Sequence, residues 1–130
     1  MQVTISEIVS NNSVATLRKL AGSEKIRDAK TVYSIVKILR RSDQEMKELQ
    51  FLFDNLWEKI DRTKFADMSD EDKAEFDRLK TIEIEKQINE VASSKTITMD
   101  ITEINSQLVL EAGFTALDLF NIDSLVSYQE

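Results

Sequence analysis

The chain has 130 residues with no Cys, His or Pro and two Gly, and its formal net charge is -7. This length suits one ordinary domain, so we expect a single helical domain over residues 1–130. Without Cys or His, zinc fingers, cysteine nucleophiles and Ser-His-Asp triads are excluded. Gly22 and Gly113 lie too far apart for a Gly-rich phosphate loop. We therefore expect no enzyme activity, no catalytic residue, no metal site and no cofactor.

The N-terminal residues have neither the basic start nor the apolar run of a signal peptide. No apolar stretch approaches the ~18 residues that a membrane-spanning helix needs. We expect a soluble protein in the cytoplasm.

The first part of the chain predicts a strand followed by a short helix. Residues 2–9 alternate polar and apolar side chains, as half-buried strands do. Ser13 is a candidate N-cap for a short helix that Gly22 would end in the left-handed conformation. Ser23 is then a candidate N-cap for the next helix.

Residues 25–62 contain no Gly or Pro and predict one long helix. Steps of three and four residues from Ala29 give an apolar stripe, and a second apolar row runs beside it. A face of this width needs covering on two sides, by the rest of the chain or by another copy. The stripe is Ala29, Val32, Val36, Leu39, Asp43, Met46, Gln50, Phe53, Trp57 and Ile60, and the second row is Ile35, Ile38, Leu49, Leu52 and Leu56.

A third helix is predicted from Ser69, as N-cap, to about Val91, because three acidic residues follow the serine. The short connection favours an antiparallel hairpin with the long helix. Its expected buried residues are Phe76, Leu79, Ile82, Ile84, Ile88 and Val91.

The C-terminal part predicts a strand over residues 96–104, with Ile97, Met99 and Ile101 on one face. We expect this strand to pair with the N-terminal one. Thr115 and Asp118 form a capping box for a short helix over 115–120, and residues 122–128 are expected to add a last helical turn. The predicted fold class is mainly α with a minor β part.

Charge is distributed unevenly along the chain. Residues 1–41 hold eight Lys or Arg and three acids, which gives +5, whereas residues 42–130 hold nine basic and twenty-one acidic side chains, which gives -12. Arg27, Arg40 and Arg41 represent the basic end as candidate partner-binding residues, and Asp70 and Glu71 represent the acidic turn. Charge of either sign can speed association with an oppositely charged partner.

Three aromatic residues lie off the counted stripe and are further candidates for partner contact: Tyr33, Phe51 and Phe65. Trp57 lies on the stripe and is expected in the core. Glu45-Met46-Lys47 and Glu71-Asp72-Lys73 carry residue types that metal nucleases use, but they lie on predicted helices rather than strands, which argues against such an enzyme.

The run from Lys25 to Lys37, followed by Leu39-Arg40-Arg41 and by Glu45, Lys47, Glu48 and Leu49, resembles small uncharacterised proteins of tailed phages and prophages. The tail over residues 96–101 and 114–119 extends this resemblance across most of the chain. The resemblance implies a long helical hairpin with a short strand-helix tail and an action through contacts, and it supplies no catalytic residues.

These observations lead to a non-enzymatic accessory protein that binds and modulates a host or phage protein and forms a homo-oligomer. Two alternatives stay open. One is a virion structural or assembly factor, and the other is an acidic mimic of nucleic acid. Nucleic acid itself is not an expected partner, because the chain is acidic and its basic run lacks interleaved aromatics.

Overall fold

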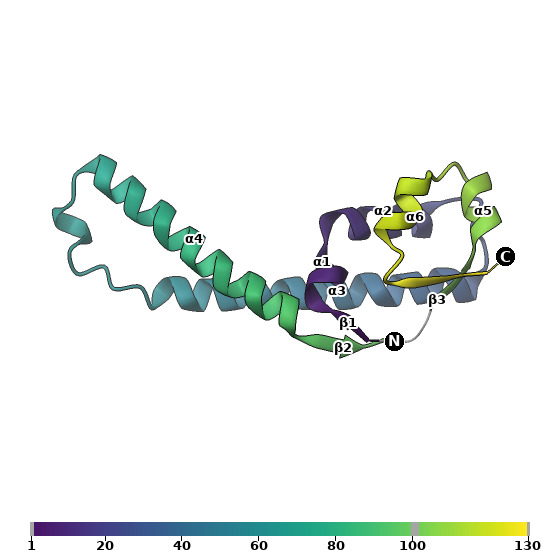
Figure 1. Ribbon diagram of the computed structural model, residues 1–130, viewed down its shortest axis with the longest axis horizontal. Coiled ribbons are helices and arrows are strands. Elements are labelled where there is room, and N and C mark those ends of the chain that lie inside the picture. The colour runs from purple at the N-terminus through teal and green to yellow at the C-terminus, as the bar shows by residue number, and fades with distance from the viewer. Residues whose placement is uncertain (1, 100–101, 130) are drawn as a thin grey trace.

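The computed structural model describes residues 2–99 and 102–129, and the order of its elements confirms a mainly α fold with a minor β part. Two long helices dominate: α3 (Ala29–Glu58) and α4 (Asp70–Ser94), joined through the short 3-10 helix η1 (Phe65–Asp67). They form the expected antiparallel hairpin, which widens toward its connecting turn as a V (Figure 1). No helix in the described ranges is both long and apolar enough to cross a bilayer.

The N-terminal segment forms a strand only over β1 (Gln2–Thr4) and then turns into the helix α1 (Ile5–Val9), so the predicted strand over 2–9 is wrong in its second half. The cause is a capping box. The Thr4 hydroxyl accepts from the Glu7 amide at 3.2 Å, and the Glu7 carboxylate accepts from the Thr4 amide at 3.3 Å. Ile5 and Ile8 are both buried because their spacing places them on one helix face.

Helix α2 (Asn11–Gly22) begins before the predicted cap, and Ser13 does not cap it. Ser13 is buried and donates its hydroxyl proton to the carbonyl of Asn121 at 2.6 Å, which ties α2 to the C-terminal region. The prediction that Gly22 adopts the left-handed conformation is also wrong. Among the residues that the structure describes, the one with a positive φ is Gly113, at 91°.

Helix α3 begins at Ala29 rather than after Ser23, because Asp28 is its N-cap. The Asp28 carboxylate accepts from the Thr31 amide at 3.2 Å and from the Thr31 hydroxyl at 2.6 Å. These bonds lower the pKa of Asp28, the hydroxyl bond contributing most.

The buried face of α3 is the second apolar row rather than the counted stripe. Ile35 and Ile38 are at most 1% exposed, and Ser42 and Glu45 continue their row at three- and four-residue steps. Leu39 and Phe53 of the counted stripe are half-buried, and Met46 is exposed. The prediction chose the wrong face of α3 because the buried positions 42 and 45 hold polar residues, Ser42 and Glu45, which interrupt the apolar pattern.

Ser69 caps α4 as predicted and accepts from the Asp72 amide at 3.1 Å. Ile84 is buried, but Leu79, Ile82 and Val91 are 40–50% exposed, contrary to prediction. None of residues 46–83 is fully buried; each is either half-buried or exposed. This distal part of the hairpin consists of two helices alone, and two helices cannot enclose a side chain on all sides.

The core lies where α1, α2, the first half of α3 and the end of α4 meet the C-terminal elements (Figure 1). Strand β1 pairs antiparallel with β2 (Thr96–Thr98), which confirms the expected pairing, with Val3 opposite Ile97. The predicted strand over 96–104 is divided in two, and Ile101 lies outside the described residues. The second piece is β3 (Thr102–Asn105).

A second strand pair was not predicted. Strand β3 runs parallel to β4 (Val126–Gln129), with Ile104 opposite Tyr128. The predicted last turn over 122–128 is present at residues 122–125, where the Leu125 and Val126 amides donate to the Ile122 carbonyl. It is wrong for residues 126–128, because the backbone of β3 takes its hydrogen-bond partners from this segment. Helices α5 (Ser106–Glu111) and α6 (Ala116–Asn121) form the crossover that a parallel pair requires. The capping box of Thr115 and Asp118 opens α6 as predicted.

Tyr128→Phe tests the contact between β4 and α6. The Tyr128 hydroxyl donates to the Leu119 carbonyl at 2.7 Å. Burial raises the pKa of this hydroxyl to about 12, and the Asp123 carboxylate adds to the shift. An unfolded tyrosine ionises near pH 10, so the unfolded state loses this proton first as pH rises, and this contribution to stability declines from about pH 10 to 12.

We expect the variant to lose about 1 kcal/mol at neutral pH. Its unfolding free energy should also fall less steeply than that of the parent above about pH 10. Urea unfolding at neutral and alkaline pH measures both effects, and equal alkaline slopes in parent and variant would contradict the assignment.

Candidate functional site: a basic groove on α3

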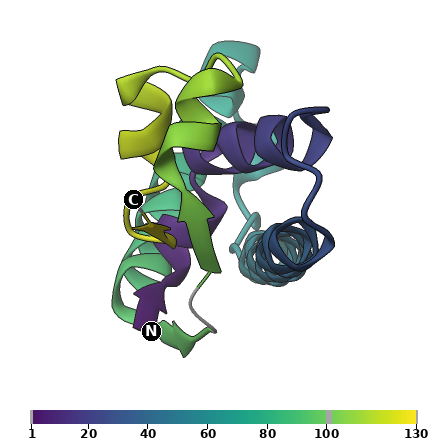
Figure 2. The same cartoon turned by 90° about the vertical axis from the view of Figure 1, so that its right-hand side faces the viewer.

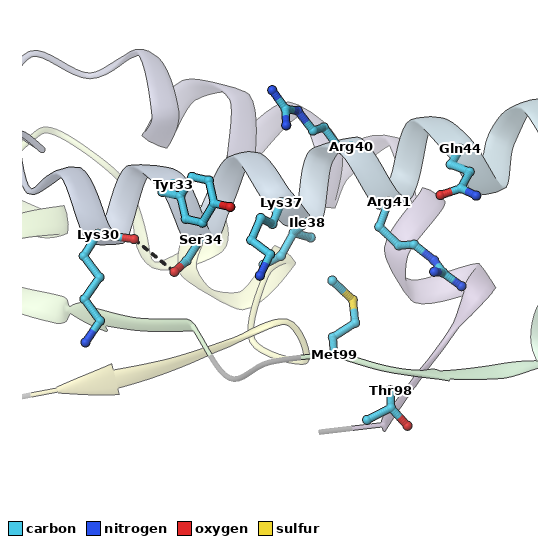
Figure 3. A pocket seen from close by; sticks show the side chains of 10 residues that line it. All are labelled: Lys30, Tyr33, Ser34, Lys37, Ile38, Arg40, Arg41, Gln44, Thr98 and Met99. Atoms are coloured by element: carbon cyan, nitrogen blue, oxygen red, sulfur yellow. Dashed lines mark hydrogen bonds between the residues drawn. The ribbon is translucent and has the colours of Figure 1, made fainter.

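A groove of about 610 Å³ runs between the first half of α3 and the end of β2 (Figure 3). Its volume lies in the range of binding clefts, ~300–1,000 Å³. Four of its lining residues are cations and, among the described residues that line it, none is acidic. The lining residues are Lys30, Tyr33, Ser34, Lys37, Ile38, Arg40, Arg41, Gln44, Thr98 and Met99.

The Asp28 cap positions the basic side chains by starting α3 directly before Lys30. Steps of three and four residues then bring Lys30, Tyr33 and Lys37 to one side of the helix. The Ser34 hydroxyl donates to the backbone carbonyl of Lys30 at 3.0 Å, and the Lys30 side chain extends away from the helix (Figure 3). The helix N-terminus adds its own partial positive charge near Lys30.

The cations of the groove differ in their surroundings. The Lys37 ammonium lies 5.6 Å from the centroid of the Tyr33 ring. The Arg41 guanidinium pairs with the Glu45 carboxylate at 2.9 Å. Within the described part of the chain, no carboxylate lies within ion-pairing distance of Lys30 or Arg40. Arg40 therefore has charge to offer a ligand, whereas Lys30 has the Asp28 carboxylate in its vicinity.

The floor of the groove is apolar. Ile38 is 1% exposed and belongs to the core. Met99 is half-buried and lies between Lys37 and Arg41 in Figure 3, whereas Arg40 points to the other side of α3. An apolar floor with cations on its rim suits a segment that carries both apolar side chains and carboxylates.

The pair of Arg41 and Glu45 anchors this surface to the core. Glu45 is 2% exposed, which is rare for a carboxylate, and Arg41 carries its charge out to the groove. The Arg41 Nε and the Ser42 hydroxyl are also buried and lack hydrogen-bond partners among the described residues. A polar layer thus separates the apolar core from the distal hairpin.

Three of the candidate residues from the sequence meet at the groove: Tyr33, Arg40 and Arg41. Arg27 is exposed in the preceding loop, where its Nε donates to the Glu24 carbonyl at 2.8 Å. Phe51 is 71% exposed further along α3. Sequence reasoning did not select Lys30, Lys37, Gln44 or Met99. The three- and four-residue spacing from Lys30 to Gln44 could have revealed the first three.

The remaining candidates lie at the far end of the hairpin. Asp70 and Glu71 are exposed in the first turn of α4. Phe65 is half-buried, with its ring centroid 5.4 Å from that of Phe76. The Arg62 guanidinium lies over Trp57, Phe65 and Phe76 at 4.6, 5.2 and 5.8 Å. The acidic residues of this turn therefore have a cation near them. Phe65 packs in an aromatic cluster within the turn.

No group of three or more Asp or Glu in the described ranges is placed to hold a metal ion. Comparisons with protein-family models, with curated proteins and with solved structures give no match for this chain.

Proposed function

We propose that this protein acts without catalysis, as an accessory protein that binds another protein, and that the α3 groove holds an acidic segment of that partner. The observation that carries this proposal is the set of Lys30, Lys37, Arg40 and Arg41 around an apolar floor. A partner carboxylate near Arg40 would provide a counter-charge that the described part of the chain does not supply. The rim cations would mainly raise the association rate and select acidic partners.

The phage relationship inferred from the sequence belongs to this proposal, as do self-association and a cytoplasmic location. A virion assembly factor would use the same groove to dock its neighbour. Mimicry of nucleic acid is less well supported, because Arg62, Lys73 and Lys80 lie among the aromatic rings near the acidic turn. Nucleic acid as the ligand is also less well supported, because the groove presents one aromatic ring, Tyr33, rather than a stacking row.

Charge reversal in the groove tests the proposal. The probe is a short labelled peptide of alternating Glu and Leu. We expect the double variant Lys30→Glu/Lys37→Glu to bind this peptide at least about tenfold more weakly than the parent does, because two attractive contacts become repulsive. Fluorescence anisotropy measures the affinity. Added salt should weaken binding to the parent, since exposed charges are screened.

The matched control is Lys64→Glu/Lys86→Glu, which makes the same charge change at exposed positions outside the groove. This control should bind the peptide nearly as well as the parent does. The proposal is wrong if both double variants bind alike, or if a peptide of alternating Lys and Leu binds the parent equally well. Tighter binding of a DNA duplex than of the acidic peptide would support a nucleic-acid ligand instead.

A further inference from the structure

The solvent side of α3 is an uncovered face that runs the whole length of the helix. Residues at steps of three and four along this outer row are all exposed, and the row lies opposite the buried row of Ile35 and Ile38. Figure 2, viewed nearly along the blue helix α3, places it at the edge of the molecule with the other elements to one side and above. The outer row is Tyr33, Lys37, Arg40, Gln44, Lys47, Phe51, Asp54 and Glu58.

This outer row is unusual for a solvated surface. Tyr33 near its start is 61% exposed, and Phe51 toward its end is 71% exposed. Such aromatic side chains are enriched at protein interfaces and otherwise expose apolar area to water. The charge also changes sign along the row, with Lys37 and Arg40 in the first half and Asp54 and Glu58 at the end. The charges of this row are therefore complementary to those of a second copy of the row that runs in the opposite direction.

We propose that a second copy of this chain packs antiparallel along the outer row of α3, so that two α3 helices form a symmetric dimer. In the register with Gln44 opposite Lys47 of the second copy, Lys37 faces Asp54 and Arg40 faces Phe51. Tyr33 then faces Glu58. Two-fold symmetry forms each of these contacts twice, so the whole row is used and each half complements the other half.

Two other arrangements of the helices are less favourable. A parallel pair in register would place Lys37 on Lys37 and Asp54 on Asp54. An antiparallel pair shifted by one turn toward the start of the helix would place Lys37 on Lys47. Like charges in direct contact oppose association, and exclusion of wrong arrangements is one way in which charged surfaces define a register.

The inference rests on the proposed function, because it names the acidic segment that the groove takes. Asp54, Phe51 and Glu58 of the second copy supply the carboxylates and the apolar ring for the groove lined by Tyr33 and Arg40. A dimer would therefore cover the groove, and release of the dimer would uncover it for another acidic partner.

A charge swap tests this register. The parent should sediment with twice its 14.9 kDa mass and dissociate on dilution. Asp54→Lys should raise the dimer dissociation constant about tenfold or more, because it creates two repulsive contacts with Lys37. Lys37→Asp should do the same. The double variant Lys37→Asp/Asp54→Lys should restore dimerisation, because the opposite charges meet again with their positions exchanged.

Circular dichroism checks that all variants remain folded, which is expected because both positions are exposed. A parent that stays monomeric at all concentrations would overturn the dimer. The register would be overturned by single variants that dimerise like the parent, or by a charge swap that fails to restore dimerisation.

The acidic peptide separates the two proposals. Asp54→Lys leaves the groove intact, so the monomeric variant should bind this peptide at least as well as the parent. Peptide binding without self-association would keep the proposed function and reject the second copy as the occupant.

Cross-linking gives an independent measurement in a chain without cysteine. Gln44→Cys/Lys47→Cys should form a disulfide-linked dimer under mild oxidation, because the proposed register places these positions opposite one another. Glu83→Cys/Lys86→Cys repeats the three-residue spacing at exposed positions of α4 and should stay monomeric. Equal cross-linking of both pairs would contradict the register.

Discussion

Replacing Ile38 with aspartate is expected to lower the free energy of unfolding by about 4 kcal/mol or more. Ile38 is 1% exposed, so the new carboxylate would lose its hydration without gaining a partner and would also displace apolar contacts. Denaturant unfolding followed by circular dichroism measures the change.

Arg40→Asp is the matched control for this substitution, because Arg40 lies two residues away on the same helix and is exposed. It should cost within about 1 kcal/mol, mostly through the lower helix propensity of aspartate. Equal midpoints for the two variants would show that the row of Ile35 and Ile38 does not face the core.

Arg41→Met is expected to destabilise the fold by about 2 kcal/mol, because it leaves the Glu45 carboxylate buried without its counter-charge. The expected loss is smaller than for a fully buried pair, since the Arg41 side chain is 42% exposed and its charge is partly solvated. Glu45→Leu should cost less, because the remaining guanidinium can reach water.

The double variant Arg41→Met/Glu45→Leu should recover most of the parent's stability, since two apolar side chains replace a desolvated ion pair. The four proteins form a double-mutant cycle, and urea unfolding supplies the free energies. Additive effects of the two substitutions would mean that the 2.9 Å contact contributes little to folding.

Local hydrogen-bonding signals were predicted in part, since Ser13 and Ser23 do not cap the helices expected of them. Ser69 caps α4 as expected, and Thr115 and Asp118 form the capping box of α6. Such caps act within one turn, so the required residues are neighbours in the sequence. The capping box of Thr4 and Glu7 is equally local, but the alternating apolar side chains of this segment fit a strand as well as a helix.

Long-range features were also predicted in part, since the pairing of β1 with β2 is confirmed. The parallel pairing of β3 with β4 depends on a crossover through α5 and α6, which no local pattern announced. The buried face of α3 was missed for a related reason. Ser42 and Glu45 are polar, and only their neighbours in the fold show that their positions are buried.

The candidate site was predicted in part. Arg40 and Arg41 were selected for their charge and Tyr33 for its position off the counted stripe, and all three line the groove. Phe65 was selected on the same grounds as Tyr33 but packs near Arg62 and Phe76. A residue that lies off the apolar stripe has its side chain on another face of the helix. The sequence does not show whether a further segment of the chain covers that face.

By itself, the sequence determined the long helix, the hairpin, the caps of α4 and α6, and the separation of a basic start from an acidic remainder. These properties depend on residue type and on spacing within a few turns. The tertiary structure decided which face of α3 is buried, where Met99 meets Lys37 and Arg41, and why the hairpin beyond Glu45 lacks a closed core. Burial depends on which distant segments surround a side chain, and no local spacing encodes those neighbours.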